Sequence, residues 1–405
     1  MRGFNIISLF VVLAINMTGC SFRSDLEGAE QSVDSLVPVE FALPDTKGMI
    51  EDLDGLVNNS SVFGMFAIDK SLFEDPEGDL TASDGMNLRN ALCRYVAPSG
   101  TEPASLKFGY ASENKVLYYP MSSDVSYNFY TYHKWTSDVS TVDGDENEGQ
   151  TVSTMVTSKR RISVVMDVAS VYDVLYSESL APYAEDSDGE LMEGYNAAFV
   201  KETGIVPTFT MKHPASAVRL SVAVDPESKK TLTKRDRFRL NSISFTNASD
   251  ALPVKASLCI VDLDAPENNG QFVEALQTVS SRAWKDAHNS TGNLNVELLH
   301  DVDGDGVTTV ASEPIKVGGE HFIMPQEEPL EITMTFQHQR LDDAGRIVGN
   351  WPAFTKTVTL DPKDFGVDGG YLAGQIYCYK LLVKYTNETG DPYKDNVEIK
   401  VEADK

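Results

Sequence analysis

The segment DVDGDG carries three aspartates whose spacing suits a cation. Asp301, Asp303 and Asp305 alternate ahead of a glycine, as at the start of an EF-hand calcium loop, in which oxygen donors surround a hard cation. The twelfth position of such a loop would be Ser312, and the acidic Glu313 comes one place late. Calcium is therefore the second choice after a solvated hairpin, because Asp-Gly pairs are natural hairpin turns.

A group of aromatic side chains could bind a sugar by stacking against its ring. The alternative is packing within a sheet, which is favoured because aromatic residues are enriched in strands and alternation hides half of them. The residues concerned are Tyr118, Tyr119, Tyr127, Phe129, Tyr130, Tyr132 and Trp135.

The histidines do not form a recognisable catalytic or metal motif. His213 lies just before a predicted strand, where a structural role is favoured over a catalytic or metal-binding one. The sequence has no HExxH pair, no G-x-S-x-G nucleophile elbow, no phosphate-binding glycine loop and no C-x-x-C. We expect a protein that is not an enzyme and needs no cofactor, although residues distant in sequence can assemble a triad.

Alternating strands must position most of these side chains. Period-2 alternation of apolar and polar residues predicts half-buried strands, separated by loops rich in Gly, Asp, Asn and Ser. The clearest strands are AVRLSVAV (217–224), EITMTFQ (331–337), FTKTVTL (354–360) and NVEIKVE (396–402). One helix is predicted over residues 271–284, where apolar residues recur at helical spacing. Residues 171–178 could form a helical turn or a strand, and the chain as a whole is predicted to be all-β.

Composition limits the partners and the cysteine chemistry. Lys and Arg number 34 against 61 Asp and Glu, a formal charge of -27 that argues against nucleic-acid binding. An odd number of cysteines remains in the folded part, Cys93, Cys259 and Cys378, so they cannot all pair with one another. Buried thiols are favoured, with one disulfide left open. At 405 residues and 41% hydrophobic content, the chain can bury two cores.

The N-terminus has the pattern of an export signal. A basic start, an apolar run over residues 4–15 and the small residues before Cys20 match the n-region, h-region and cleavage site. The run is shorter than the roughly 20 residues that span a bilayer. MTGC resembles the lipobox of bacterial lipoproteins, which implies a signal peptide at 1–19 and a lipidated Cys20; ordinary secretion is the alternative. Asp25 and Glu27 resemble surface-export signals of the Bacteroides group and imply an outer-membrane location at the cell surface.

The rest of the chain divides at two predicted boundaries. Residues 20–35 are polar and predicted to be a tether or propeptide. LVPVEFAL (36–43) is a predicted strand, in which Val37, Val39 and Phe41 alternate ahead of a break at Pro44. A second boundary near Pro207 gives predicted domains at 36–205 and 206–405.

Several segments in order resemble the fimbrillin-like (Mfa-like) subunits of Bacteroides-group bacteria. They are SVFGMFAID, NKVLYYPMSSDVSYNFYTYHKW, YDVLYSES, FTMKHPASAVRLSVAV and GGYLAGQIYCYKLLVKY. The resemblance covers most of residues 37–405. It implies two tandem transthyretin-like β-sandwich domains with few short helices, exported as a lipoprotein and assembled with other fimbrial subunits to bind a surface receptor. In that family a protease removes the first strand, here Val37, Val39 and Phe41, and a neighbour's C-terminal strand fills the groove, which satisfies the exposed backbone groups.

Two departures from the family bear on the position in the fibre. The family is usually cleaved after an arginine that follows the first strand, whereas this chain offers Lys47 there and Arg23 far upstream. An uncleaved strand would fit an anchor. The chain stops soon after its last predicted strand, which fits a tip or accessory subunit that accepts a strand and donates none. The tip or accessory role is slightly favoured; a non-polymerising glycan-binding surface lipoprotein is the alternative function.

Overall fold

The computed structural model describes residues 36–43, 61–81, 88–101, 104–110, 112–113, 115–120, 125–136, 139–142, 150–153, 155–169, 173–185, 189, 191–228, 235–284, 294–300 and 313–404. Residues from Val37 onward form one compact unit. Strands dominate this unit, so the all-β prediction is confirmed. Within the described part of the chain, every helix is too short or too polar to span a lipid bilayer.

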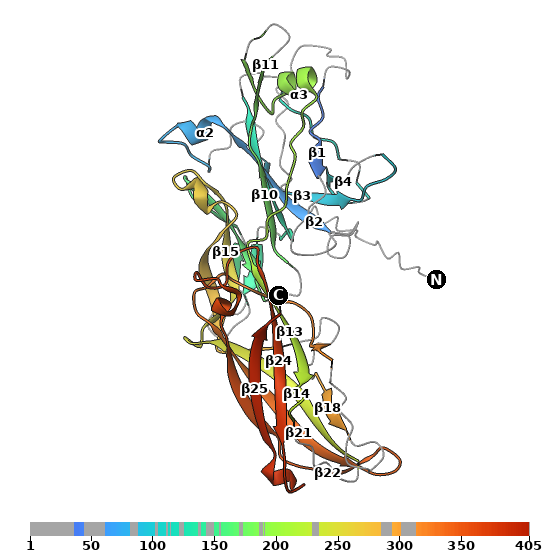
Figure 1. The fold of residues 1–405 in the computed structure, drawn as a ribbon. Helices are drawn as coiled ribbons and strands as arrows, with labels where there is room; N and C mark the ends of the chain where they lie inside the picture. The colour runs from blue at the N-terminus through green and yellow to red at the C-terminus, as the bar shows by residue number, and fades with distance from the viewer. Residues whose placement is uncertain are drawn as a thin grey trace, which may run out of the picture. The chain divides into compact units, whose positions relative to one another are not determined.

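The first half of the chain builds a six-stranded sheet (Figure 1). All neighbours in this sheet run antiparallel. In spatial order its strands are β1 (Phe41–Leu43), β4 (Ala104–Phe108), β3 (Leu88–Val96), β2 (Val62–Asp69), β5 (Tyr127–His133) and β10 (Leu175–Ser179).

Both faces of this sheet are covered, which explains why β2 and β5 are buried along almost their whole length. Phe63, Phe129 and the side chains of β1 pack on one face with helix α3 (Ala197–Thr203). Phe66 and Tyr130 pack on the other face against a four-stranded sheet. A strand buried on both faces loses the alternation of a half-exposed one.

The four-stranded sheet combines strands from both sides of the predicted boundary near Pro207. Its strands in order are β16 (Phe272–Val279), β15 (Leu252–Asp262), β9 (Arg161–Asp167) and β8 (Met155–Thr157). The join is the antiparallel pair of β9 and β15, in which Met166 lies opposite Ala256. The hairpin β15–β16 thus completes the core next to the six-stranded sheet.

The second half of the chain forms a sandwich of two sheets. One sheet has β13 (Ser216–Val224) parallel to β24 (Ile376–Thr386), with β25 (Asn396–Ala403), β19 (Ile315–Lys316) and β20 (His321–Ile323). The other has β14 (Asp236–Asn247) and β21 (Leu330–Leu341) at its centre, flanked by β17 (Arg282–Ala283), β18 (Val296–His300), β22 (Ile347–Asn350) and β23 (Phe354–Leu360). The inward side chains interdigitate in one core. The four clearest predicted strands are confirmed within β13, β21, β23 and β25.

The predicted helix over residues 271–284 is wrong. That segment forms β16 and β17, and Ala256 on β15 lies opposite Ala275 on β16. Its apolar residues recur at a spacing that also fits a helix, but pairing with β15 decides the conformation, because strand propensity depends on sheet context. Residues 171–178, for which the sequence allows a helical turn or a strand, include the start of β10.

The remaining elements are short. They are α2 (Ser71–Glu74), the 3-10 turns η2 (Pro266–Asn268), η3 (Pro362–Phe365) and η4 (Pro392–Lys394), and the hairpins of β6 (Val139–Val142) with β7 (Gln150–Ser153) and β11 (Tyr183–Glu185) with β12 (Leu191–Glu193).

Candidate functional site: two edge strands and a buried charge cluster

Strand β1 and Val39, two residues before it, insert three apolar side chains into the core of the six-stranded sheet. Val39, Phe41 and Leu43 are 6%, 3% and 6% exposed. The Phe41 ring centroid lies 5.4 Å from those of Phe108 and Phe129, in edge-to-face contacts. Val37 is half-buried at the margin of the same core. The predicted alternation of this segment is therefore confirmed, with its apolar side directed inward.

The regular ladder of β1 is short, and the residues before it bond to another segment: Val39 N donates to Leu117 O at 2.9 Å, and Val37 O accepts from Tyr119 N at 3.0 Å. β1 pairs with β4 over three residues, Phe41 to Leu43. On the other side, Ala42 N donates to Pro207 O at 3.0 Å, and Ala42 O accepts from Phe209 N at 3.0 Å. Pro38 has no N–H to donate. Buried side chains and backbone hydrogen bonds to three separate segments together hold residues 37–43 in place.

Strand β25 lies at the edge of its own sheet and is held differently. All eight of its residues pair with β24, from Asn396 opposite Thr386 to Ala403 opposite Tyr379. Its inward side chains are Val397, which is buried, and Ile399 and Val401, which are half-buried.

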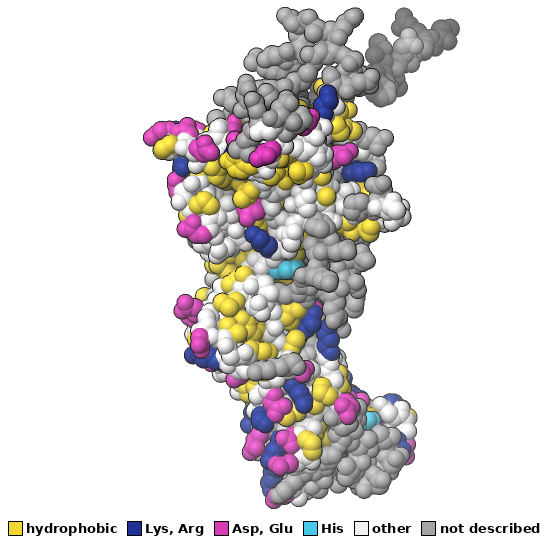
Figure 2. All heavy atoms as spheres, turned by 45° about the horizontal axis from the view of Figure 1, so that its top comes forward, with side chains coloured by type: hydrophobic (Ala, Val, Ile, Leu, Met, Phe, Trp, Pro, Cys, Tyr) yellow, Lys and Arg dark blue, Asp and Glu magenta, His cyan; other side chains and the backbone are white. Residues whose placement is uncertain are grey.

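Ion pairs also lie on the outward side of this sheet. Glu402 of β25 contacts Lys400 at 2.7 Å and Lys380 of β24 at 3.8 Å. Figure 2 shows one face of the molecule, on which basic side chains lie among acidic ones over the lower part of the view. The acidic chain therefore does not present a surface of one sign there.

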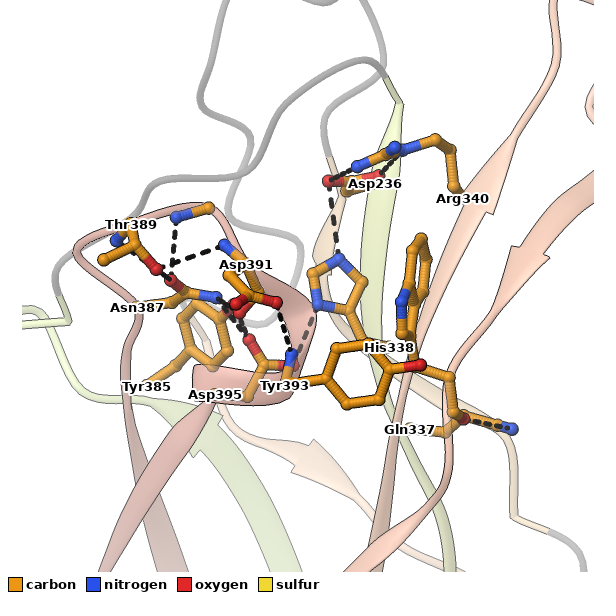
Figure 3. A network of polar contacts seen from close by, with 12 residues as sticks. Asp236, Gln337, His338, Arg340, Tyr385, Asn387, Thr389, Asp391, Tyr393 and Asp395 are labelled. Carbon is orange, nitrogen blue, oxygen red and sulfur yellow. Dashed lines mark hydrogen bonds and ion pairs between the residues drawn. The ribbon is translucent and has the colours of Figure 1, made fainter.

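A buried charge cluster closes the end of the sandwich core just before β25. The Nδ1 atom of His338 on β21 lies 2.8 Å from Oδ2 of Asp395, the residue preceding β25, and its Nε2 lies 3.5 Å from Oδ2 of Asp236 on β14 (Figure 3). Arg340 donates to both oxygens of Asp236, at 2.6 and 3.0 Å. Tyr385 donates its hydroxyl to Asp395 at 2.6 Å.

The cluster shifts the pKa values of its members in opposite directions. Burial alone would lower the pKa of His338, but its contacts with Asp236 and Asp395 raise it to about 9. Burial alone would raise the pKa of Asp236, but His338 and Arg340 lower it to about 2. The imidazolium and the Asp236 carboxylate are therefore both charged near neutral pH, and the cluster works as a buried clamp between the two sheets.

The geometry of the clamp fits a structural role. The side chains of His338, Asp236 and Asp395 are 2%, 0% and 2% exposed. A substrate could reach none of the three without opening the end of the sandwich. What the arrangement does chemically is tie Asp395, and with it the beginning of β25, to β14 and β21.

Three groups of predicted site residues lie outside the described part of the chain. They are the lipidation site Cys20, the candidate cleavage site Lys47, and the candidate calcium ligands Asp301, Asp303 and Asp305. Among the described residues, no group of three or more His, Cys, Asp or Glu side chains could hold a metal ion.

Five of the seven aromatic side chains are packed inside the sheet, and the other two, Tyr118 and Trp135, are half-buried. Tyr119, Tyr127, Phe129, Tyr130 and Tyr132 are all at most 2% exposed, in the two cores that flank the six-stranded sheet. Sheet packing, which the sequence favours over sugar stacking, is confirmed for these five side chains; four of them lie on β5, where neighbouring layers cover both faces.

His213 and the cysteines have the structural roles that the sequence favours. The Nδ1 atom of His213 contacts the buried carboxylate of Asp173. Cys93 and Cys259 are buried free thiols, and Cys378 is a half-buried one. Burial raises the pKa of Cys259 to about 12 and that of Cys93 further, so neither thiol ionises near neutral pH.

Sequence reasoning missed the charge cluster, although a signal for it exists. The inward positions of β21 run Ile332, Met334, Phe336 and then His338. A histidine that continues the apolar side of an alternating strand is directed toward the core, where it needs partners. Asp236 and Asp395 could not be named as those partners, because they come from segments about 60 to 100 residues away in sequence.

Comparison with known proteins gives matches among solved structures. No family model matches the chain, and no curated protein matches its sequence. A candidate cell adhesion protein of Bacteroides uniformis is 15% identical over 91% of this chain and 99% of that chain, with a TM-score of 0.42. A fimbrial protein of Bacteroides vulgatus is 12% identical over 90% and 99%, with a TM-score of 0.43. The fimbrial anchor protein Mfa2 of Porphyromonas gingivalis is 11% identical over 90% and 97%, with a TM-score of 0.32. Proteins of the kind that the sequence resembles are thus among the solved structures similar to this chain.

Proposed function

We propose that the chain is a non-enzymatic subunit of surface fimbriae, assembled with other subunits by exchange of its first strand. The precursor is a lipoprotein lipidated at Cys20 and carried to the outer face of the outer membrane. A protease then cuts after the first strand, with Lys47 as the candidate site. A donor strand from a neighbouring subunit takes the place of β1.

The observation that carries the proposal is the contrast within β1 between side-chain burial and backbone pairing. Val39, Phe41 and Leu43 fill the groove, at roughly 1.5–3 kcal/mol each, whereas the only regular backbone ladder of residues 37–43 covers three residues, opposite β4, and their other backbone hydrogen bonds go to residues 117–119 and 207–209. Removing such a strand leaves an apolar groove beside unpaired backbone groups of β4. Any extended segment with the same alternation satisfies both.

The firm attachment of β25 to its own sheet supports a subunit that accepts a donor strand and donates none. This strand is paired with β24 along its whole length and clamped at its beginning by Asp395. A strand held so firmly in its own sandwich is a poor donor. The tip or accessory position is accordingly favoured over the anchor.

The test is strand replacement in a cleavable form of the protein. A specific protease site is introduced within residues 44–47, and a fluorescent peptide with the sequence of residues 36–43 is added before and after cutting. We expect stable incorporation only after cutting, because covalent attachment keeps the intact strand at a high effective concentration.

A peptide in which aspartate replaces the residue equivalent to Phe41 is the matched control, since a charge cannot enter the apolar groove without a large desolvation cost. The proposal fails if the cut protein stays folded without its first strand and does not take up the unaltered peptide. N-terminal sequencing of the mature protein gives a second reading: a start near Gly48 supports removal of β1, and a lipidated Cys20 start contradicts it.

A further inference from the structure

Residues 207–212 bound the groove of β1 on the side opposite β4. Ala42 N donates to Pro207 O, and Ala42 O accepts from Phe209 N, so this segment runs parallel to β1. At its other end, Lys212 exchanges two backbone hydrogen bonds with β10, at 2.7 and 3.0 Å. The 207–212 segment therefore joins β1 and β10, the two outermost strands of the six-stranded sheet.

The 207–212 segment is also attached to the protein independently of β1. Phe209 and Met211 are buried in the same core as β1. Thr208 N donates to the side-chain oxygen of Ser179 on β10 at 3.0 Å. These contacts do not involve β1, so they remain when the first strand leaves. A binding surface that is held in this way before a ligand arrives loses less conformational entropy on binding.

The two sides of the groove set the direction of any strand that replaces β1. Successive residues of a strand direct their N–H and C=O groups to opposite edges. Ala42 bonds to the 207–212 segment, so Phe41 and Leu43 direct these groups to β4, with which they pair antiparallel. A replacing strand must therefore run in the direction of β1 and carry a free N–H at the position of Ala42.

The pocket of Phe41 sets a further requirement, because aromatic rings surround it. The ring centroid of Phe41 lies 5.4 Å from those of Phe108 and Phe129 and 5.6 Å from that of Phe209. Pairs of aromatic rings at such separations are more stable than their buried area alone accounts for. The pocket therefore favours an aromatic side chain over an aliphatic one at the middle of the three inward positions.

Strand β25 of this chain does not meet that requirement. Its three inward positions are Val397, Ile399 and Val401, so an aliphatic side chain would enter the pocket of Phe41. Alternation lets such a strand enter the groove, but without the ring contacts it binds less tightly.

We infer that the groove selects a donor strand from a different subunit, one that runs in the direction of β1 and has an aromatic residue at its middle inward position. The 207–212 segment makes this selection with β4, since it supplies both the hydrogen-bond partners of Ala42 and one of the rings around Phe41. The inference rests on the proposed exchange of β1. It adds that copies of this chain are poor donors to one another.

The experiment measures how well unlabelled peptides displace the fluorescent peptide of residues 36–43 from the cut protein. N-methylation at Ala42 removes the hydrogen bond to Pro207 O and should weaken binding by at least about tenfold. N-methylation at Glu40 is the matched control and should leave binding unchanged, because within the described part of the chain no hydrogen bond joins the Glu40 N–H to another residue. A peptide of reversed sequence, with the same composition and alternation, should also bind at least about tenfold more weakly.

A second pair of peptides tests the pocket of Phe41. The peptide of residues 396–403 should bind at least about tenfold more weakly than that of residues 36–43. Ile399→Phe in that peptide should recover part of the loss, since it returns an aromatic ring to the middle position.

The outcomes separate this inference from the exchange itself. If the cut protein does not take up the unaltered peptide of residues 36–43, strand exchange fails and the inference fails with it. If that peptide is taken up but the reversed and Ala42-methylated peptides compete equally well, exchange stands and the role of the 207–212 segment is refuted. If the peptide of residues 396–403 competes as well as that of residues 36–43, the selection of an aromatic donor is refuted.

Discussion

Strands β1 and β25 both lie at the edge of a sheet, yet they are held by opposite means. β1 and the residue Val39 before it place three buried side chains in a groove, and β1 pairs with β4 over three residues, whereas β25 pairs with β24 over eight residues and buries only Val397 completely. β25 also has a charged clamp at its beginning, where Asp395 meets His338. An edge strand can therefore be deeply buried and still be replaceable by another segment.

The difference lies in what another segment could reproduce. Apolar side chains in a groove are a pattern that many sequences share, and the hydrophobic effect is not directional. The contacts of β25 are specific to its sequence, since Asp395 must meet both His338 and Tyr385, and Glu402 must face Lys380. We therefore regard β1 as a replaceable part of the fold and β25 as a permanent one.

The largest expected effect comes from removing each strand. Cutting between residues 44 and 47 should leave the C-terminal sandwich folded, because β1 contributes to a different core. Deleting residues 396–404 should abolish the fold of that sandwich, since it uncovers the inner core and opens the clamp, at a cost comparable to the roughly 5–15 kcal/mol that stabilise a domain. Fluorescence of the buried Trp284 reports on the C-terminal core in both proteins. If the cut and the deletion unfold the C-terminal sandwich equally, β1 is as necessary to that sandwich as β25, and the two strands do not differ in the way described.

A single substitution in β1 should have the next largest effect. Phe41→Ala empties the centre of the groove and should lower the free energy of unfolding by about 3–5 kcal/mol, as for other buried aromatic residues. Denaturant titration measures the loss. Val37→Ala, at the half-buried margin of the same core, serves as control and should cost less than half as much. If both substitutions cost the same, the groove is not centred on Phe41 and strand exchange needs another driving force.

Much of this contrast was visible in the sequence, for a physical reason. Alternation sets which side of a strand is buried, and it predicted the apolar side of both LVPVEFAL, of which Phe41–Leu43 forms a strand, and NVEIKVE. Alternation also identified β13, β21 and β23. These assignments depend only on neighbours within one segment, so no knowledge of the fold was needed.

The parts that sequence missed depend on distant partners. The alternative conformation of residues 271–284 was decided by pairing with β15. The clamp needs Asp236, His338 and Asp395, which come from three separate elements. The aromatic residues of β5 were open to two interpretations because a single strand does not reveal that both of its faces are covered. Long-range contacts, and not local propensity, account for each case.

The stability that the clamp gives to the C-terminal sandwich should depend on pH, in contrast to the stability of the core around β1. The folded pKa of His338, about 9, lies above its unfolded value near 6.5, so its contribution is complete below pH 6.5 and is lost as the pH rises toward 9. The difference corresponds to about 3 kcal/mol. Thermal unfolding measured between pH 6 and 10 should show this loss for the C-terminal sandwich and not for the core around β1.

His338→Gln is the control for that prediction, since glutamine cannot carry the charge. The variant should be less stable near neutral pH, because Asp236 and Asp395 lose their shared cation. Its stability should no longer fall between pH 6.5 and 9. If the stability of the variant kept its full pH dependence, a group other than His338 would be the one that titrates. The clamp would then not distinguish β25 from β1.

The smallest change in stability is expected from a substitution on the outward side of β25. Glu402→Gln removes ion pairs with Lys400 and Lys380, all of which are solvent-accessible. Surface pairs add little, because water and salt screen them and two long side chains must be ordered. The melting temperature should therefore change by no more than about 1 °C, measured at low and at high salt. A large, salt-sensitive drop in the melting temperature would mean that surface ion pairs, and not the ladder and the clamp, hold β25 in its sheet. The two edge strands would then differ in their surface charges.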